Sequence, residues 1–149
     1  METITTLLSQ QHHDCDKLFA QAEESVATTQ WECASVDFDR FRAAMEQHFI
    51  REEQILFPQV ENHMGHTEGP TAVMRMEHQQ MRQIFTEMAA CIAHLDQEQY
   101  LGLAETLLIL MQQHNAKEEQ ILYPMSDNLL NHQLPSLLEQ LHQLGNNKA

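Results

Sequence analysis

The sequence predicts an all-α protein, an antiparallel up-down-up-down four-helix bundle with a short C-terminal helix. The first reason is composition: the 149 residues include only four Gly and four Pro but nine Met. Leu, Gln, Glu and Ala are also plentiful, which favours helices, whereas the β-branched and aromatic residues typical of sheets are scarce. The second reason is apolar periodicity at helical spacing in four long stretches. The third is an internal repeat, and the short connections between the stretches favour antiparallel packing.

The repeat is clearest in two segments that lie 66 residues apart. Residues 47–58 read QHFIREEQILFP and residues 113–124 read QHNAKEEQILYP, with eight of the twelve positions identical. Such a dense match is poorly explained by chance. We therefore expect a single domain over residues 1–149 that consists of two hairpin repeats, at about 4–64 and about 70–130.

The same offset aligns a second pair of segments more faintly. Residues 11–19 fall on residues 77–85, and His12 falls on His78. The alignment thus selects His12 rather than its neighbour His13. Each half is expected to contain one helix with a lone His, a connection, and one helix with the pattern His-x-x-x-Glu.

The helix limits follow from the apolar period and from helix-breaking residues. The expected ranges, in chain order, are about 4–27, 36–60, 71–95, 98–128 and 135–144. Gly65 and Gly69 separate the two halves. Pro58 and Pro124 are each expected to kink or end a helix, because proline lacks an N–H group and clashes with the preceding turn.

Charge and cysteine content exclude several classes of function. The formal net charge is −14, and no cluster of Lys and Arg interrupts it, so we expect no binding to nucleic acid or to anionic membranes. The N-terminus shows no secretion signal, and no apolar run is long enough to span a membrane. Cys15, Cys33 and Cys91 form no close-spaced pair, which suits a reducing compartment. A cytoplasmic protein is therefore expected.

Histidine is the unusual residue, with ten copies against eight Lys plus Arg. His48 and Glu52 are spaced i, i+4, as are His114 and Glu118, so each pair points to one side of its helix. The apolar stripes that contain them read Phe41, Met45, His48, Glu52, Ile55 and Leu107, Met111, His114, Glu118, Ile121. A charged side chain on such a stripe is costly unless it has a partner.

An isolated pair of this kind is commonly explained by a hydrogen bond or ion pair inside the bundle. Two copies, together with a lone His on each remaining helix, instead favour a metal site. The predicted metal ligands are His12, His48, Glu52, His78, His114 and Glu118.

This set of side chains narrows the choice of metal. Four imidazoles and two carboxylates are too many for one tetrahedral zinc, and calcium or magnesium prefers oxygen ligands throughout. Mixed imidazole and carboxylate suits iron, with manganese or zinc possible. Two metal ions about 3.5–4 Å apart, bridged by Glu52 and Glu118, would use every ligand and give each ion two His.

Three further residues remain as alternatives to this set. Glu53 and Glu119 follow the two glutamates, about 100° further round the helix, and are expected in solvent or in salt bridges. Either would become a ligand if its helix over-rotated near the proline. His13 is the rival to His12. The other histidines, expected to be exposed, are His63, His66, His94, His132 and His142.

These motifs are the basis of a resemblance to the hemerythrin-like (HHE cation-binding) family, over about residues 4–130. It rests on the two His-x-x-x-Glu-Glu motifs that end in Leu-Phe-Pro and Leu-Tyr-Pro, and less specifically on His12 and Glu77-His78. The resemblance implies a four-helix bundle around two iron ions, oxo- or hydroxo-bridged. Members of the family bind dioxygen reversibly, sense oxygen or redox state, or handle nitric oxide and peroxide.

One position departs from the oxygen-carrying members of the family. These place a second His one turn before the His of the third helix, where this chain has Met74, and Leu8 is its counterpart in the other repeat. A thioether is a poor ligand for a hard ferric ion. We expect Met74 to pack in the core, which leaves four His and two Glu and weakens the inference of a respiratory oxygen carrier.

The resemblance thus implies a non-haem di-iron protein that binds or senses dioxygen or a related diatomic molecule. The alternatives are a redox or stress protein that handles nitric oxide or peroxide, iron–sulfur cluster repair, and iron storage. Proteins of the repair class carry an additional N-terminal domain with cysteine, which does not appear in this sequence. No Ser/His/Asp set, phosphate loop or nucleotide motif is visible, so a binding protein is expected rather than an enzyme.

Overall fold

The computed structural model describes residues 1–146, and no strand occurs among them. Residues 147–149 of the predicted domain lie outside the described range. The α-helices are α1 (Ile4–Ala27), α2 (Trp31–Arg51), α3 (Phe57–Met64), α4 (Pro70–Ala93), α5 (Gln97–Lys117), α6 (Tyr123–Leu129) and α7 (Leu134–Asn146). The π-helical segments η1 (Glu52–Leu56) and η2 (Glu118–Leu122) join α2 to α3 and α5 to α6, and the 3-10 turn η3 (Asn131–Gln133) precedes α7.

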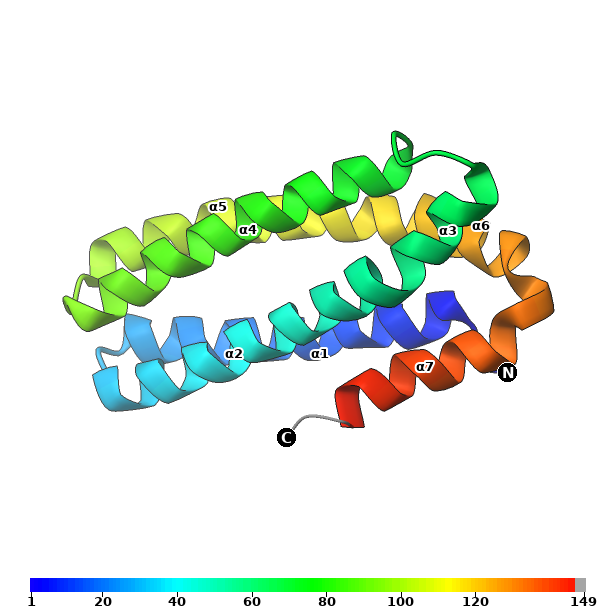
Figure 1. The fold of residues 1–149 in the computed structure, drawn as a ribbon. Helices are drawn as coiled ribbons and strands as arrows, with labels where there is room; N and C mark the ends of the chain where they lie inside the picture. Colours follow the sequence, from blue (N-terminus) through cyan, green and yellow to red (C-terminus); the bar gives the residue numbers. More distant parts are fainter. Residues whose placement is uncertain (147–149) are drawn as a thin grey trace.

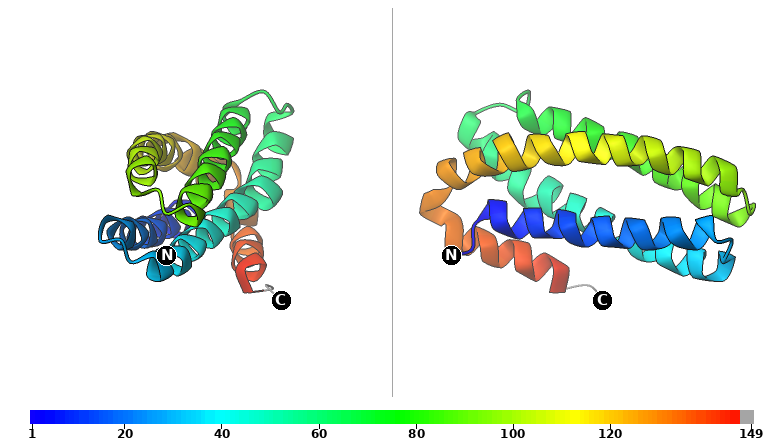
Figure 2. Two further views of the ribbon diagram at one scale, coloured as in Figure 1. Left: turned by 90° about the vertical axis from the view of Figure 1, so that its left-hand side faces the viewer. Right: turned by 180° about the vertical axis from the view of Figure 1, so that it is seen from behind.

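The four long helices form two antiparallel hairpins that lie against each other (Figure 1). Helix α1 packs on α2 in the first hairpin and α4 packs on α5 in the second. Contacts between α1 and α5 and between α2 and α4 hold the hairpins together. The end-on and rear views show the same arrangement, with α7 outside the bundle along α2 and η1 (Figure 2). The predicted all-α, up-down-up-down bundle with a C-terminal helix is confirmed.

Helix α1 begins where side chains satisfy its free N–H groups. Thr3 and Thr6 form a capping box, in which each side chain accepts a hydrogen bond from the backbone N–H of the other. Asp127 of α6 accepts hydrogen bonds from the N–H groups of Ile4 (2.7 Å) and Thr5 (3.1 Å). A carboxylate at this end also complements the helix dipole, so it ties α1 to the far end of the second repeat.

The two hairpins turn in the same way. Thr29 and Leu95 are the non-glycine residues with positive φ, 53° and 56°, among the described residues. They lie at the repeat offset of 66 residues, and each follows the end of the first helix of its hairpin. The left-handed conformation costs a residue with a side chain about 1–2 kcal/mol. Because both hairpins adopt this conformation at matched positions, the structural repeat includes the turns as well as the helices.

Helix α2 begins at Trp31, five residues before the predicted start at residue 36. Its N-cap residue Gln30 makes no side-chain hydrogen bond to the helix end, so the usual sequence signal for a helix start is missing. Packing sets the start instead, because Ala34 is fully buried and Trp31 lies against the core. The other predicted starts agree with the structure within one residue.

Neither proline ends the helical backbone. The chain keeps right-handed helical angles at Arg51 and Phe57, on either side of η1, and Pro58 lies in the first turn of α3. The same holds around η2 and Pro124. The sequence predicted a kink or an end, and the structure shows a change to a wider π turn just before each proline. That turn keeps the carbonyl four residues earlier clear of the proline ring.

The extra residue in each π turn changes which side chains face inward. Leu122 is 2% exposed, whereas Ile121, predicted on the inner face, is 61% exposed. In the first repeat Leu56 is likewise buried, and Ile55 only partly so. The inward prediction for Ile121 is therefore wrong, because a strict α-helical period was carried through η2, whereas Ile55 is partly buried and packs against the core as expected.

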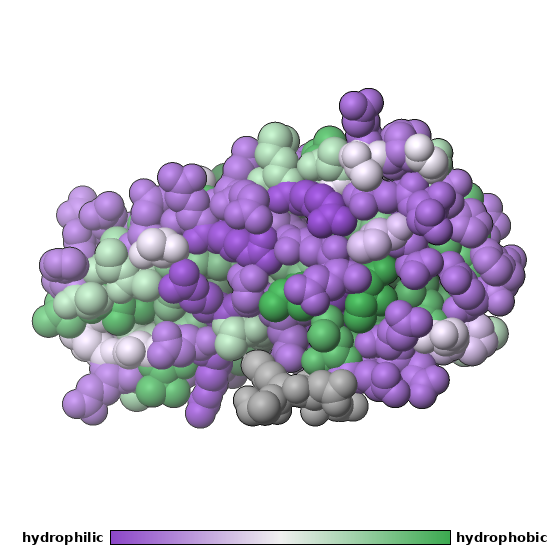
Figure 3. Space-filling view, viewed as in Figure 1, coloured by the Kyte–Doolittle hydropathy of each residue, from purple (hydrophilic) through white to green (hydrophobic). Residues whose placement is uncertain are grey.

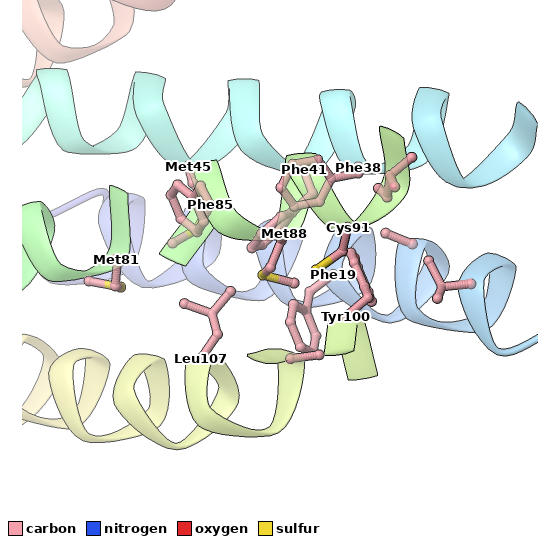
Figure 4. Close-up of a cluster of buried hydrophobic side chains, with 14 of the residues drawn as sticks. Phe19, Phe38, Phe41, Met45, Met81, Phe85, Met88, Cys91, Tyr100 and Leu107 are labelled. Atoms are coloured by element: carbon pink, nitrogen blue, oxygen red, sulfur yellow. The ribbon is translucent and has the colours of Figure 1, made fainter. Parts of the chain in front are cut away.

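Two apolar clusters fill the bundle, one on each side of a polar layer. The cluster in Figure 4 lies towards the hairpin turns and contains Phe19, Phe38, Phe41, Met45, Met81, Phe85, Met88, Cys91, Tyr100 and Leu107. The other contains Ile4, Leu8, Leu56, Phe57, Val60, Met74, Leu122, Tyr123, Leu130, Leu134, Leu137 and Leu141. Met74 packs in the core as expected, and α7 covers the second cluster with Leu137 and Leu141.

Hydrophilic side chains cover most of the face seen in Figure 3, as the acidic composition leads one to expect. Among residues 1–146, none of the helices combines the length and the apolar character that a membrane crossing requires.

The shifted register predicts unequal costs for two neighbouring truncations. Leu122→Ala removes a buried side chain and should lower the free energy of unfolding by about 2–5 kcal/mol. Ile121→Ala changes an exposed side chain and should change it by less than about 0.5 kcal/mol. Urea unfolding of the two metal-free variants measures both values. Equal losses would contradict the π-helical register.

Candidate metal centre

The six predicted ligands meet in the polar layer between the two apolar clusters. All six are buried, with exposures of 0–4%: His12, His48, Glu52, His78, His114 and Glu118. They form two groups of four, and within each group the donor atoms lie within 4.8 Å of one another. His12 and His48 belong to the first group, His78 and His114 to the second, and the two glutamates to both.

The first group draws its histidines from the first hairpin. The Nε2 atoms of His12 and His48 lie 3.1 Å apart. Glu118 Oε1 lies 3.0 Å from His12 Nε2, and Glu52 Oε2 lies 3.4 Å from His48 Nε2. Two ring nitrogens and two carboxylate oxygens, one from each glutamate, therefore face one point.

The second group is its counterpart in the second hairpin. Glu52 Oε1 lies 3.0 Å from His78 Nε2, and Glu118 Oε2 lies 3.3 Å from His114 Nε2. Each glutamate thus presents one oxygen to each group. This arrangement matches the predicted sharing of both carboxylates between two pairs of histidines, whereas binding of metal by these residues stays a prediction.

The outer ring nitrogens of two histidines are held by the opposite hairpin. His12 Nδ1 lies 2.6 Å from Glu119 Oε2, and His78 Nδ1 lies 2.6 Å from Glu53 Oε2. Arg82 donates to the same Glu53 carboxylate at 2.8 Å. The predicted salt-bridged role of Glu53 is thereby observed, and neither Glu53 nor Glu119 belongs to the central groups.

The other two histidines are held within their own hairpins. His48 Nδ1 lies 2.8 Å from Gln11 Oε1, and His114 Nδ1 lies 2.8 Å from Glu77 Oε1. Both pairs are separated by 37 residues in the chain, which reflects the repeat. Lys117 forms a salt bridge with Glu77 at 2.5 Å.

This outer shell fixes the protonation of the rings. In a neutral imidazole one nitrogen carries the proton and the other a lone pair. Because each Nδ1 faces a carboxylate or amide oxygen, it is the nitrogen that keeps the proton when the ring is neutral, and the neutral ring then offers its Nε2 lone pair to the centre. Metal-binding histidines are commonly oriented in this way.

Buried polar atoms that lack a hydrogen-bond partner indicate whether these residues fit a metal ion. Among the described residues, the buried side-chain atoms that lack a hydrogen-bond partner are Glu52 Oε1, His78 Nε2, His114 Nε2, Glu118 Oε2 and the Tyr100 hydroxyl. The first four are the donor atoms of the second group. They meet one another only as the His–Glu pairs at 3.0 and 3.3 Å, and a cation between them would be bound by all four.

The electrostatics of the layer also favour positive charge. Burial opposes the charge on His48, but the Glu52 and Glu118 carboxylates outweigh it and raise the pKa of His48 to about 10. His114 behaves alike, with its pKa raised to about 9 chiefly by Glu118 against the effect of burial. Burial alone would raise the pKa of Glu118, yet His114 and the other imidazoles hold it well below its usual range. In the metal-free protein, protons supply the charge that a metal would bring.

The structure separates the chosen histidines from their rival. His13 is exposed, belongs to neither central group, and lines a groove between α1 and α5. Glu119, the partner of His12, also lines that groove.

Sequence reasoning missed three residues of the site: Gln11, Glu77 and Tyr123. The repeat carried a signal for the first two, because each directly precedes the lone His of its half at the same offset. Tyr123 aligns with Phe57, and this replacement of one aromatic residue by another gave no sign of a separate role. Only the π turn reveals that Tyr123 reaches the centre, where its hydroxyl lies 2.8 Å from Glu118 Oε1.

Residues 3–126 of the chain match the family model of the hemerythrin HHE cation binding domain. Comparisons with curated proteins and with solved structures gave no match. The chain belongs to the hemerythrin HHE cation-binding family, and its buried clusters of histidine and glutamate fit a metal-binding protein.

The raised histidine pKa values predict an unusual pH dependence in the metal-free protein. His48 and His114 stabilise the fold fully below their ordinary pKa of 6.5, and this contribution is lost as the pH rises towards about 10 and about 9. Urea unfolding midpoints should therefore fall between pH 6.5 and 9. Metal-loaded protein should not show this fall, because coordination requires neutral imidazoles. A midpoint that rises over this range without metal would contradict the assignment.

The outer carboxylates predict a graded loss of metal affinity. Glu119→Ala leaves His12 Nδ1 without its acceptor and should weaken metal binding by about 10–100-fold, as measured by competition with a chelator. Glu119→Gln keeps an oxygen acceptor and should lose less. Glu105→Ala, at an exposed position of α5, is the control and should leave affinity unchanged. Equal affinities for all three variants would show that Glu119 does not support the site.

Proposed function

We propose that the protein binds two iron ions through the six central residues and uses them to bind or sense dioxygen or a related diatomic molecule. The observation that carries the proposal is the sharing of Glu52 and Glu118 between two buried pairs of histidines. Mixed imidazole and carboxylate donors suit iron, with manganese or zinc as alternatives. Iron would supply the redox activity and the affinity for a diatomic molecule that the side chains lack.

The surroundings of the centre favour a small ligand. The Phe49 ring stacks on His78 with centroids 4.0 Å apart, and the Phe57 ring approaches the same imidazole at 5.7 Å. Met74 and Met111 are also buried nearby on α4 and α5. These side chains exclude bulk water and leave no room for a large substrate, so we infer a ligand of a few atoms.

The groove between α1 and α5 is the access route that we favour. It brings solvent to Glu119, whose side chain is 35% exposed and whose carboxylate holds His12. Asp16 and Glu23 also line this groove. Their negative charge would favour the approach of a cation and would not hinder a neutral diatomic molecule.

A second candidate function is reaction with nitric oxide or peroxide. The observation that favours it is the burial of Met74 among apolar side chains, which leaves the second group with two histidines and the shared glutamates. A metal held there would keep a position open to an external ligand.

We also propose a reducing, cytoplasmic setting. Cys15, Cys33 and Cys91 are all free thiols, two of them buried. Burial raises the pKa of the Cys15 thiol to about 12, with Asp16 and Asp14 adding to the effect, so this cysteine is held in the unreactive form.

Metal counting and optical spectroscopy test the proposal. The protein is purified without oxygen, its metals are counted, and spectra are recorded before and after air is admitted. We expect two iron ions per chain and a spectral change that reverses when oxygen is removed. An irreversible change would favour the second candidate, and fewer than about one metal ion per chain would overturn the site.

Removal of a shared carboxylate should abolish the metal pair. Glu52→Ala and Glu118→Ala each remove a carboxylate that supplies one oxygen to each of the two groups, so neither variant should hold two ions. Glu105→Ala serves again as the control, since Glu105 is an exposed residue of α5 that belongs to neither group. Two ions per chain in both variants would show that the glutamates are not shared ligands.

A further inference from the structure

One difference between the two halves of the centre lies at a position next to the repeated prolines. Phe57 and Tyr123 occupy matched places, each between the π segment and the proline. Phe57 can offer only a ring, which stacks on His78. Tyr123 is fully buried and carries a hydroxyl that points into the polar layer. The hydroxyl therefore gives the first group a polar atom that has no counterpart at the second group.

The Tyr123 hydroxyl approaches every donor of the first group. It lies 2.5 Å from Glu52 Oε2 and 2.8 Å from Glu118 Oε1. The Nε2 atoms of His12 and His48 lie 3.1 and 3.4 Å away. The π turn makes this possible, because it places residue i+5 above residue i and so brings Tyr123 over Glu118.

Hydrogen bonding alone does not account for these approaches. A phenol has one proton and can donate it to one acceptor, and the closest acceptor is Glu52 Oε2. Glu118 Oε1 then faces the phenol oxygen lone pair to lone pair, since an ionised carboxylate has no proton to donate. This contact inside an apolar bundle is unfavourable unless a positive charge lies close by, and a metal ion bound by both oxygens would supply it.

The distances suit neighbouring ligands of one metal ion. Nitrogen and oxygen ligands bind metals at about 2.0–2.2 Å, so two ligands at right angles lie about 3 Å apart. The four separations from the Tyr123 oxygen, 2.5 to 3.4 Å, lie around that value. The oxygen therefore occupies the place of a fifth ligand beside the other four.

We propose that Tyr123 binds the metal of the first group through its phenolate oxygen. This inference rests on the proposed function. On metal binding the Tyr123 O–H bond breaks, the oxygen keeps the electron pair that binds the metal, and the proton leaves to solvent without transfer of electrons. Phe57 cannot do the same at the second group, so the exchangeable position for an external ligand belongs to the metal held by His78 and His114.

Formation of the phenolate would depend on the metal. In the metal-free protein the Tyr123 hydroxyl keeps its proton and donates it to Glu52 Oε2. A bound cation would take the place of that proton, because it becomes the largest local charge. A tyrosinate signal should therefore appear only when metal is bound.

The chain is well suited to a spectroscopic test, because it contains only two tyrosines, Tyr123 and Tyr100. The full-length protein is loaded with ferrous iron, oxidised in air and studied by visible absorption and resonance Raman spectroscopy. We expect a charge-transfer band that enhances tyrosinate ring vibrations. Tyr100→Phe, which alters the other buried tyrosine in the distant cluster of Figure 4, should keep the signal.

Variants of the repeat pair complete the test. Tyr123→Phe copies the residue that its counterpart already has, so it should fold, retain two iron ions and lose the tyrosinate signal. Phe57→Tyr offers a phenol to the second group and should increase the signal. Two bound irons without tyrosinate vibrations in the unaltered protein would overturn this inference alone. A chain that binds no metal would overturn the proposed function and this inference together.

Discussion

The structure depends on the burial of two carboxylates and four imidazoles in the middle of an apolar bundle. Such groups are tolerated only when each polar atom has a partner. The outer nitrogens find theirs in Glu53, Glu77, Glu119 and Gln11, whereas four inner donor atoms lack a hydrogen-bond partner and meet only as the pairs His78–Glu52 and His114–Glu118. The two apolar clusters hold this layer closed above and below. The requirement for positive charge at the centre therefore follows from packing as much as from the ligand types.

The π turns link the backbone to the site. Each begins at the glutamate of a His-x-x-x-Glu pair, so the pair keeps the i, i+4 spacing that aligns histidine and glutamate on one side. The wider turn then rotates the following residues, so that Leu56 and Leu122 seal the core. It also places residue i+5 above the glutamate. Local irregularities of this type are common at functional sites, and here both copies of the repeat have one.

Much of the fold and of the central layer could be predicted from the sequence, and the reasons are local. The repeat selected His12 over His13, and the helical period placed all four motif residues on inner faces. The errors arose where long-range packing overrides local signals. Helix α2 begins at Trp31 without a side-chain cap. Ile121 points outward because of a π turn that no single residue in the sequence predicts. The outer partners, such as Glu77, depend on the distance between helices, which spacing along one helix does not reveal.

The contacts of the outer shell are reciprocal between the hairpins. Glu53 of the first holds His78 of the second, and Glu119 of the second holds His12 of the first. Reciprocity of this kind is the hallmark of an isologous interface, in which two identical subunits are related by a two-fold axis. The arrangement within the chain therefore resembles a two-fold dimer of one hairpin whose two copies are joined into a single polypeptide. Joining the halves allows each to change separately, and a hydroxyl on one side alone is a difference that an identical pair could never acquire.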